Sequence, residues 1–149
     1  MRKMLIATVA ALLVAGSATA GADECFTRTY DRAHLARHPD QMVTLVSLRL
    51  RRSPRWFMVQ FTLRDRDKPF ESVGICRPDG HCYVEGDGGG LDYERTASGL
   101  MMRLDRIRVA EYGKDIIDAT SPEITSGTDD RVFRLDRVTC ENDPQGMQN

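Results

Sequence analysis

From Gln41 onward, apolar and polar residues alternate with a period of two in a series of short segments. The clearest segment covers residues 55–64, where one face carries Phe57, Val59, Phe61 and Leu63. Because successive side chains of a β-strand point to opposite faces, this pattern predicts a strand with one buried face. An earlier segment predicts a strand whose shared face carries Met42, Thr44, Val46, Leu48 and Leu50.

Further segments of strand pattern follow along the chain at residues 70–76, 82–85, 91–96, 100–104, 107–112 and 131–140, with a weaker one at Ile116-Ile117. Turn-forming residues separate them at intervals of roughly 8–12 residues, a spacing typical of antiparallel folds. Residues 113–130 lack a clear pattern and are expected to form a long loop. The sequence therefore predicts an all-β fold, a single antiparallel β-sandwich or small β-barrel of about eight strands.

A single short helix is expected ahead of these strands, over residues 32–37. Thr29 or Asp31 can cap its first turn, because side-chain oxygens of these residue types accept hydrogen bonds from free backbone N–H groups. His38-Pro39 ends it, since the residue before a proline is driven out of helical backbone geometry.

The first twenty residues have the pattern of an export signal. Two basic residues precede an uncharged apolar stretch of about thirteen residues, and Ala18 and Ala20 supply the small pair of a cleavage site. The apolar stretch is too short to span a bilayer as a helix, which needs roughly 20 residues. We expect residues 1–20 to be a cleaved signal peptide, residues 21–149 to form one periplasmic or secreted β-domain, and no segment to span the membrane.

Four cysteines, Cys25, Cys76, Cys82 and Cys140, follow the export signal. An even number of cysteines in an oxidising compartment predicts two disulfides. Cys76 and Cys82 flank Pro78-Asp79-Gly80, which is turn chemistry, so we expect these two on facing arms of one hairpin and Cys25 bonded to Cys140. Pairing of Cys25 with Cys76 and of Cys82 with Cys140 is the alternative. Zinc is disfavoured because the chain has no C-x2-C pair.

The charge balance disfavours one class of partner. The chain has 21 basic and 22 acidic residues, a net charge of −1, which becomes −3 without the signal. A nucleic-acid binder normally carries a basic surface, so no nucleic acid is expected as a partner. The basic residues beyond the signal are seventeen arginines and only two lysines. Guanidinium groups bind carboxylates and phosphates in two-point fashion, so an anion-binding surface and plain solvated charge are the two interpretations.

Two segments are candidates for ligand contact. An arginine cluster with Trp56 surrounds the turn between the first two strands, a combination that suits an acidic partner or an anionic envelope glycan. The glycine run at 86–90 resembles a mobile loop that contacts a ligand. The alternatives are a solvated hairpin tip and a glycine-rich bulge. The expected ligand-binding residues are Arg49, Arg51, Arg52, Trp56, Asp87 and Gly88.

Candidates for chemistry are few. His34 and His38 are spaced so that both rings could face one metal ion from the expected helix, with His81 or a carboxylate as a third ligand, but no glutamate follows His34 as in the H-E-x-x-H pattern. They are weak metal candidates, and we expect neither a metal nor a cofactor. No G-x-S-x-G nucleophile motif occurs and the cysteines are expected to be bonded, so no catalytic residue is named.

These patterns favour a small exported, disulfide-stabilised β-domain that acts as a non-catalytic binding module for a protein, an envelope glycan or a small ligand. A structural envelope protein without a dedicated ligand is one alternative. A periplasmic metal-binding protein or a hydrolase with an unrecognised site is the other. The sequence does not identify the ligand.

Overall fold

The computed structural model describes residues 22–53, 55–114, 121–127 and 129–142. Its elements in chain order are β1 (Glu24–Thr29), α1 (Arg32–Arg37), β2 (Val43–Arg52), β3 (Arg55–Leu63), β4 (Phe70–Cys76), β5 (His81–Tyr83), β6 (Gly89–Arg95), β7 (Gly99–Arg108), β8 (Ala110–Glu111), β9 (Glu123–Thr125), β10 (Val132–Val138) and the 3-10 turn η1 (Cys140–Asn142). The expected export signal and the expected weak strand at Ile116-Ile117 lie outside the described residues.

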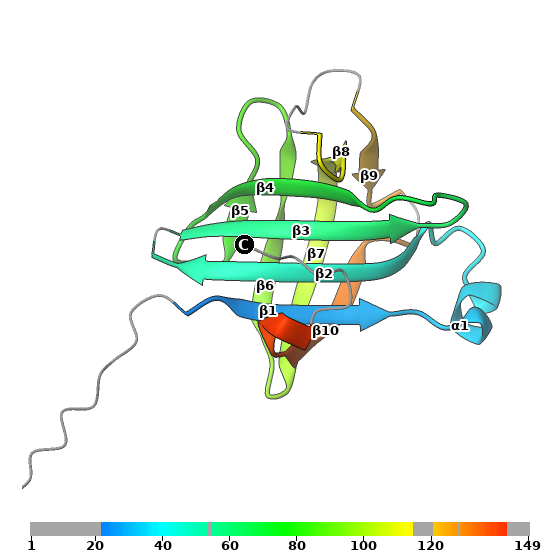
Figure 1. Ribbon diagram of the computed structural model, residues 1–149, viewed down its shortest axis with the longest axis horizontal. Helices are drawn as coiled ribbons and strands as arrows, with labels where there is room; N and C mark the ends of the chain where they lie inside the picture. Colours follow the sequence, from blue (N-terminus) through cyan, green and yellow to red (C-terminus); the bar gives the residue numbers. More distant parts are fainter. Residues whose placement is uncertain (1–21, 54, 115–120, 128, 143–149) are drawn as a thin grey trace, which may run out of the picture.

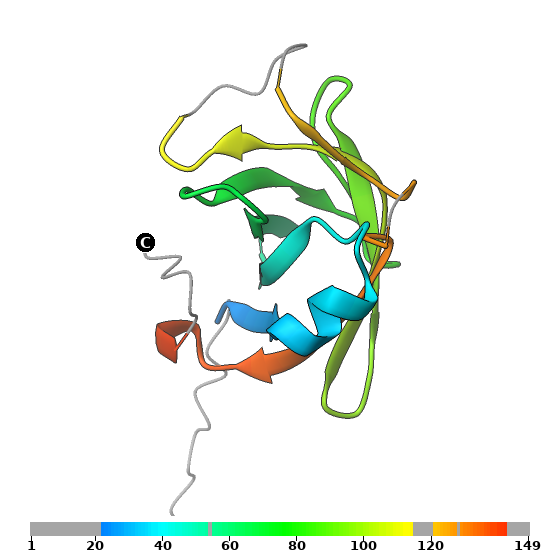
Figure 2. The ribbon, with the colours of Figure 1, turned by 90° about the vertical axis from the view of Figure 1, so that its right-hand side faces the viewer.

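Eight of these strands form a closed antiparallel barrel. The order around the ring is β1-β2-β3-β4-β5-β6-β7-β10, and β10 pairs with both β7 and β1, which closes it. In Figure 1, β1 to β4 cross in front of β6 and β7, and Figure 2 shows the strands curving around a common interior. The short strands β8 and β9 pair with β4 and β7 outside the ring. The all-β prediction is confirmed, and of the two predicted architectures the protein adopts the barrel.

Side chains from the inner faces of the strands fill the barrel. Phe57, Val59 and Phe61 of β3 are fully buried, as their alternation predicts. Phe26 of β1 and Phe133 of β10 join the same core cluster from the strands that follow β2 around the ring. Large aromatic side chains remove much apolar surface from water and are a major source of the stability of such a core. The interior is therefore packed with side chains, and the hollows described below lie at one end of the barrel and in its wall.

Two β-bulges explain where the strand predictions are wrong. A register shift between Val43 and Leu45 leaves Val43 buried and Met42 44% exposed, so Met42 is not on the core face of β2. In β7, Asp105 is skipped in the pairing with β6, so the inward positions continue from Leu104 to Ile107. An extra residue inverts the alternation. The predicted segments 100–104 and 107–112 are therefore one long strand followed by β8.

Two further strands lie where the sequence pattern shows none. β1 contains only two fully buried residues, Cys25 and Phe26, which are adjacent and do not alternate. β9 lies within the predicted loop 113–130 and has one buried residue, Ile124. Both strands form because longer neighbouring strands offer them pairing partners. Tertiary context of this kind overrides a weak local pattern.

The predicted helix forms as α1, capped by Asp31, whose carboxylate accepts a hydrogen bond from the backbone N–H of His34 at 2.7 Å. It lies at the end of the barrel opposite the β2–β3 hairpin (Figure 1). Arg64 holds it there by donating to the carbonyls of Leu35 and His38 at 2.7 and 2.9 Å. Within the part of the chain that the structure describes, no helix has the length and apolar character needed to cross a membrane.

Both expected disulfides are present. Cys76 of β4 is bonded to Cys82 of β5, and Cys25 of β1 is bonded to Cys140 of η1. The pairing expected from the hairpin is therefore confirmed, and the alternative pairing is excluded. The long-range bond lies close to the strand pair β1–β10, one of the seams at which the ring closes.

Candidate functional site

One end of the barrel collects arginine side chains from well-separated parts of the chain. Arg52 and Arg55 are paired across the β2–β3 hairpin, two residues beyond the inward-facing Leu50 and Phe57. Arg95 and Arg137 continue the inward faces of β6 and β10, and Arg77 follows β4. In a strand, alternate residues share a face, so the side chains of Arg52, Arg55, Arg95 and Arg137 extend the core positions into the barrel mouth, whereas Arg77 lines the mouth from the turn after β4. We call this set, Arg52, Arg55, Arg77, Arg95 and Arg137, the arginine end.

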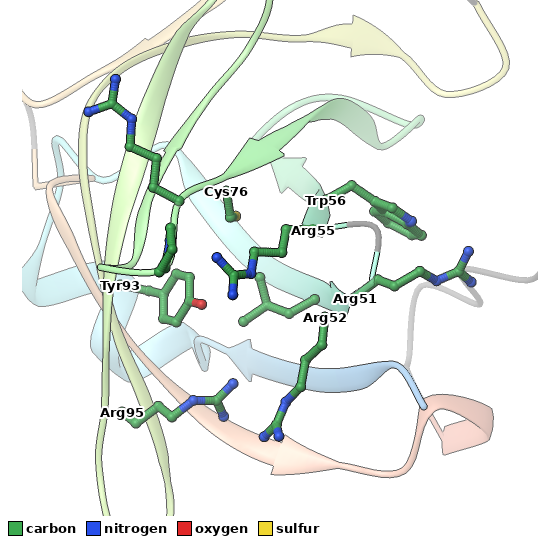
Figure 3. Close-up of a pocket in the computed structure, with 10 residues that line it drawn as sticks. Arg51, Arg52, Arg55, Trp56, Cys76, Tyr93 and Arg95 are labelled. Carbon is green, nitrogen blue, oxygen red and sulfur yellow. The ribbon is translucent and has the colours of Figure 1, made fainter. Parts of the chain in front are cut away.

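Four members of the arginine end, Arg52, Arg55, Arg77 and Arg95, line a hollow of about 240 Å³, and Arg137 is joined to them through Glu24. Leu50 and the disulfide-bonded Cys76 lie at its apolar base, and Tyr93 forms part of its side. Figure 3 shows the side chains of Arg55 and Tyr93 pointing into this space and Arg52 and Arg95 at its border. The hollow is therefore a shallow, positively charged pocket closed at the bottom by the packed core.

Glu24 is bound by three members of the arginine end. Its carboxylate accepts hydrogen bonds from Arg52 at 3.3 Å, from Arg95 at 3.1 Å and from Arg137 at 3.2 Å. The Glu24 side chain is only 11% exposed. Burial raises the pKa of Glu24, but the hydrogen bond from Arg95 and the positive charges of Arg95, Arg52 and Arg137 outweigh this and hold the pKa below its ordinary value. Glu24 shows that the arginine end already holds one carboxylate.

The contribution of Glu24 to stability should depend on pH. Because its pKa is lower in the folded than in the unfolded state, the stabilisation is fully present above the ordinary pKa of 4.5 and is lost as the pH falls through the folded value. Urea midpoints measured from pH 7 to pH 3 should show the difference between wild type and Glu24→Gln narrowing below about pH 4.5. Glu94→Gln, at a 68% exposed position, is the control and should show no such narrowing. A difference that stays constant across this range would contradict the assignment.

Arg55 and Arg77 differ from the other three arginines. Neither makes an ion pair within the residues that the structure describes, and both line the hollow. The five guanidinium groups thus contact only one carboxylate, that of Glu24, in the described part of the chain. Five positive charges and one negative charge leave a local excess of positive charge at this end, although the chain as a whole carries a net charge of −1. Such an excess in a partly enclosed site attracts anions.

The structure divides the predicted arginine–tryptophan cluster between two faces of the barrel wall. Arg51 and Trp56 are cross-strand partners on the outer face, with the guanidinium 4.8 Å from the ring centroid. Asp23 accepts hydrogen bonds from Arg51 at 2.7 and 3.0 Å and lies 3.1 Å from Arg49, and these contacts lower the pKa of Asp23. Figure 3 shows the side chains of Arg51 and Trp56 directed toward the outer face, although both residues line the border of the hollow. Of the predicted cluster, Arg51, Arg52 and Trp56 therefore line the hollow, and Arg49 does not.

The glycine-run residues lie elsewhere on the barrel. The carboxylate of Asp87 is paired with Arg106 at 2.7 Å and with Arg108 at 3.5 Å, and the hydrogen bond from Arg106 lowers the Asp87 pKa. Gly88 is buried, its carbonyl accepts a hydrogen bond from the backbone N–H of Arg108, and a Cβ there would lie 2.4 Å from Val84. These contacts give Asp87 and Gly88 a structural role in joining the loop to β7. They do not meet the arginine–tryptophan residues.

The rings of His34 in α1 and of His38 at its C-cap are stacked on each other, and they do not surround a position for a metal ion. Their rings lie 4.4 Å apart, His34 is hydrogen-bonded to Gln41 at 3.0 Å, and His38 lies 3.4 Å from Asp129. In the described ranges, no three or more His, Cys, Asp or Glu side chains are grouped in a way that could hold a metal ion. The third histidine, His81, is hydrogen-bonded to Asp92 on the β5–β6 pair.

Four members of the arginine end, Arg55, Arg77, Arg95 and Arg137, are missing from the expected ligand-binding residues. Arg55 adjoins the predicted cluster, but Arg77, Arg95 and Arg137 are far from it in the sequence. Arg95 and Arg137 continue the alternation of the buried positions in β6 and β10. This alternation is the only sequence signal that could have placed their side chains on the inner face of the sheet. Parity shows the face on which a residue lies, but not which strands meet at that end of a barrel.

Comparison of this chain with protein-family models, with curated proteins and with solved structures finds no match. Any conclusion about function must therefore come from the side chains of this protein and their arrangement.

Proposed function

We propose that the protein is an exported, non-catalytic binding module of the cell envelope, and that the arginine end holds an anionic group of its ligand. The observation that carries this proposal is the presence of Arg55 and Arg77, without ion pairs in the described part of the chain, beside three arginines that already bind a carboxylate. Two disulfides are compatible with an oxidising compartment. The proposal includes residues 1–20 as the export signal and residues 21–149 as one domain.

The size of the hollow limits the kind of ligand. At about 240 Å³ it is smaller than the roughly 300–1,000 Å³ typical of sites that enclose a whole drug-sized molecule. It suits a single carboxylate, phosphate or sulfate group that belongs to a larger molecule. The ring of Tyr93 offers an apolar surface next to that group, as sugar rings and peptide side chains require. The ligand we expect is an acidic glycan or an acidic protein segment.

Replacing Arg55 and Arg77 together with glutamine should weaken binding of an acidic polymer by about tenfold or more. Charge-assisted hydrogen bonds contribute about 1.5–3 kcal/mol each when sheltered, and solvent screening at this open site reduces that figure. Isothermal titration calorimetry with polygalacturonate and with polyglutamate at low salt measures the change and compares the two ligand sources. Neutral dextran should not bind. Raising the salt to about 0.5 M should weaken binding further, because screening shortens the range of the arginine charges.

The matched control is Arg32→Gln with Arg37→Gln. These two exposed arginines of α1 lie at the opposite end of the barrel, so the control removes the same charge without touching the arginine end. Its affinity should stay within about twofold of wild type, because a distant exposed charge is largely screened. Equal losses in both double variants would mean that only net charge matters. No loss in the Arg55/Arg77 variant would remove the site from consideration.

A further inference from the structure

The wall of the barrel has an opening beside β4. On its edge away from β3, β4 pairs with β5 at Ile75 and Cys76 and with β8 at Phe70 and Glu71. Between these two pairings, residues 72–74 have no strand partner on this edge among the described residues, although their other edge is paired with β3. The gap exists because β5 is only three residues long and β8 only two. We call this gap the wall opening.

The backbone of Val73 faces the wall opening. The N–H of Arg77 donates to the carbonyl of His81, and the N–H of Tyr112 donates to the carbonyl of Pro69. In an antiparallel strand, every second residue directs its N–H and C=O to the same edge, so the residues from Pro69 to Arg77 that share this parity face β5, β8 and the opening. Val73 is the one that falls in the gap. Its N–H and C=O therefore lack a strand partner within the described chain.

Ser72 adds a third polar group. Its side chain lines the hollow over the wall opening, the residue is 1% exposed, and its hydroxyl has no hydrogen-bond partner within the described structure. A buried hydroxyl without a partner is costly, so each such group calls for an explanation. A donor and an acceptor on Val73, together with the hydroxyl of Ser72, are the groups that a peptide unit of a bound segment would satisfy.

The surroundings of these polar groups are apolar. The hollow has a volume of about 770 Å³. On the outer face of the sheet, Met58 lies opposite Val73 and Trp56 lies opposite Ile75. Val73 and Ile75 are 48% and 41% exposed, which is high for neighbouring branched side chains on one sheet face. An apolar patch next to an unpaired strand edge is the arrangement used for strand addition, in which backbone bonds supply affinity and side-chain contacts supply specificity.

The charges at the border of the hollow are mixed but favour a cation. Glu71 and Glu85 line it, and its one lysine, Lys114, lies 3.8 Å from Glu111, which partly neutralises it. Glu85 is exposed and makes no ion pair within the described residues. The wall opening thus differs in charge from the arginine end. A segment that combines apolar side chains with a basic residue complements it.

We propose that the wall opening binds an extended peptide segment of another protein. The backbone of one residue of this segment pairs with Val73, and its side chain lies on the outer face beside Val73 and Ile75. A neighbouring peptide carbonyl accepts a hydrogen bond from the hydroxyl of Ser72, and a basic side chain lies near Glu85. Because β5 and β8 close the two ends, the segment that enters is only a few residues long. This inference is independent of the anion site, which uses other backbone and side-chain groups.

The test is a titration of the 15N-labelled protein, followed by NMR, with the capped peptide acetyl-Lys-Val-Thr-Val-Lys-amide. The expected result is a saturable shift of backbone amides at residues 72–74, 84–85 and 109–111. The same peptide with N-methyl groups on its central residues keeps its side chains and charge but loses backbone donors. It should bind about tenfold more weakly, since a lost backbone hydrogen bond of about 1–1.5 kcal/mol corresponds to roughly that factor. Equal affinity for the two peptides would overturn strand addition.

Variants complete the test. Ile75→Lys places a charge on the apolar patch without altering the backbone and should abolish the shifts, whereas Val132→Lys, at a 42% exposed position on β10, should leave them unchanged. Arg55→Gln with Arg77→Gln should also leave peptide binding unchanged, which separates this proposal from the anion site. Shifts centred on the arginine end would overturn the proposal. A dimer of the free protein in sedimentation velocity that Ile75→Lys abolished would assign the opening to a second copy and would also overturn it.

Discussion

Replacing Cys25 and Cys140 together with alanine should lower the free energy of unfolding by about 5 kcal/mol. The two cysteines are 115 residues apart, and in the chain-entropy treatment a crosslink that closes so long a loop removes much of the freedom of the unfolded chain. The bond also ties β1 to the turn that follows β10, near the seam where the ring closes. Urea unfolding followed by circular dichroism, extrapolated linearly to zero urea, measures the loss.

The second disulfide is the control for loop length. Cys76 and Cys82 are only 6 residues apart, so the Cys76→Ala, Cys82→Ala variant should lose about 2 kcal/mol. Domains of this size have a total stability of roughly 5–15 kcal/mol, so loss of the long-range bond alone is expected to leave the protein close to unfolding. Equal losses in the two variants would show that local strain or packing, and not loop entropy, determines what the disulfides contribute.

Phe133→Ala should cost about 3–5 kcal/mol, the second-largest expected effect. Phe133 is 1% exposed, lies opposite Met102 in the pairing of β10 with β7, and its ring centroid is 6.2 Å from that of Phe61. Removing the ring from a core of this kind loses its transfer free energy and leaves a cavity between strands from distant parts of the chain. The unfolding free energy from urea titration is again the measurement.

The neighbouring residue provides the comparison for Phe133. Val132 belongs to the same strand but is 42% exposed on the other face, so Val132→Ala should change stability by no more than about 0.5 kcal/mol. If Phe133→Ala cost as little stability as Val132→Ala, the barrel would not depend on packing at the β7–β10 seam. β10 would then be stabilised by its backbone pairing rather than by its inward face.

How far the fold could be predicted depends on how local each signal is. The alternation in β3, the cap at Asp31 and the turn between Cys76 and Cys82 are each contained within about ten residues, and all three predictions are confirmed. The prediction fails where a residue is inserted into the alternation, as at Asp105, or where a strand is too short to alternate, as in β1. In both cases the information lies in the pairing partner and not in the segment itself.

The candidate site follows the same rule. Arg52 and the inward position of Arg55 follow from the parity of one hairpin, but the separation of Arg52 from Arg51 shows that neighbours in sequence can lie on opposite faces of a barrel wall. Asp23 and Glu24 adjoin Cys25 in the sequence, yet Asp23 binds outward-facing arginines and Glu24 binds arginines of the barrel mouth. Adjacent residues of a strand point to opposite faces, but the sequence pattern shows no strand at β1, so this division could not be predicted.

By itself, the sequence determined the class of fold, the position of the helix and the Cys76–Cys82 pairing, because each depends on interactions between residues close together in the chain, and Cys25–Cys140 followed as the pair that remained. Only the tertiary structure decided that the sheet closes into a barrel, that Arg52, Arg77, Arg95 and Arg137 gather at one end, and that Val73 faces an opening in the wall. The physical reason is strand pairing. Closure of the ring and the lengths of β5 and β8 determine which distant residues meet and which backbone groups stay unpaired, and neither can be inferred from any single segment.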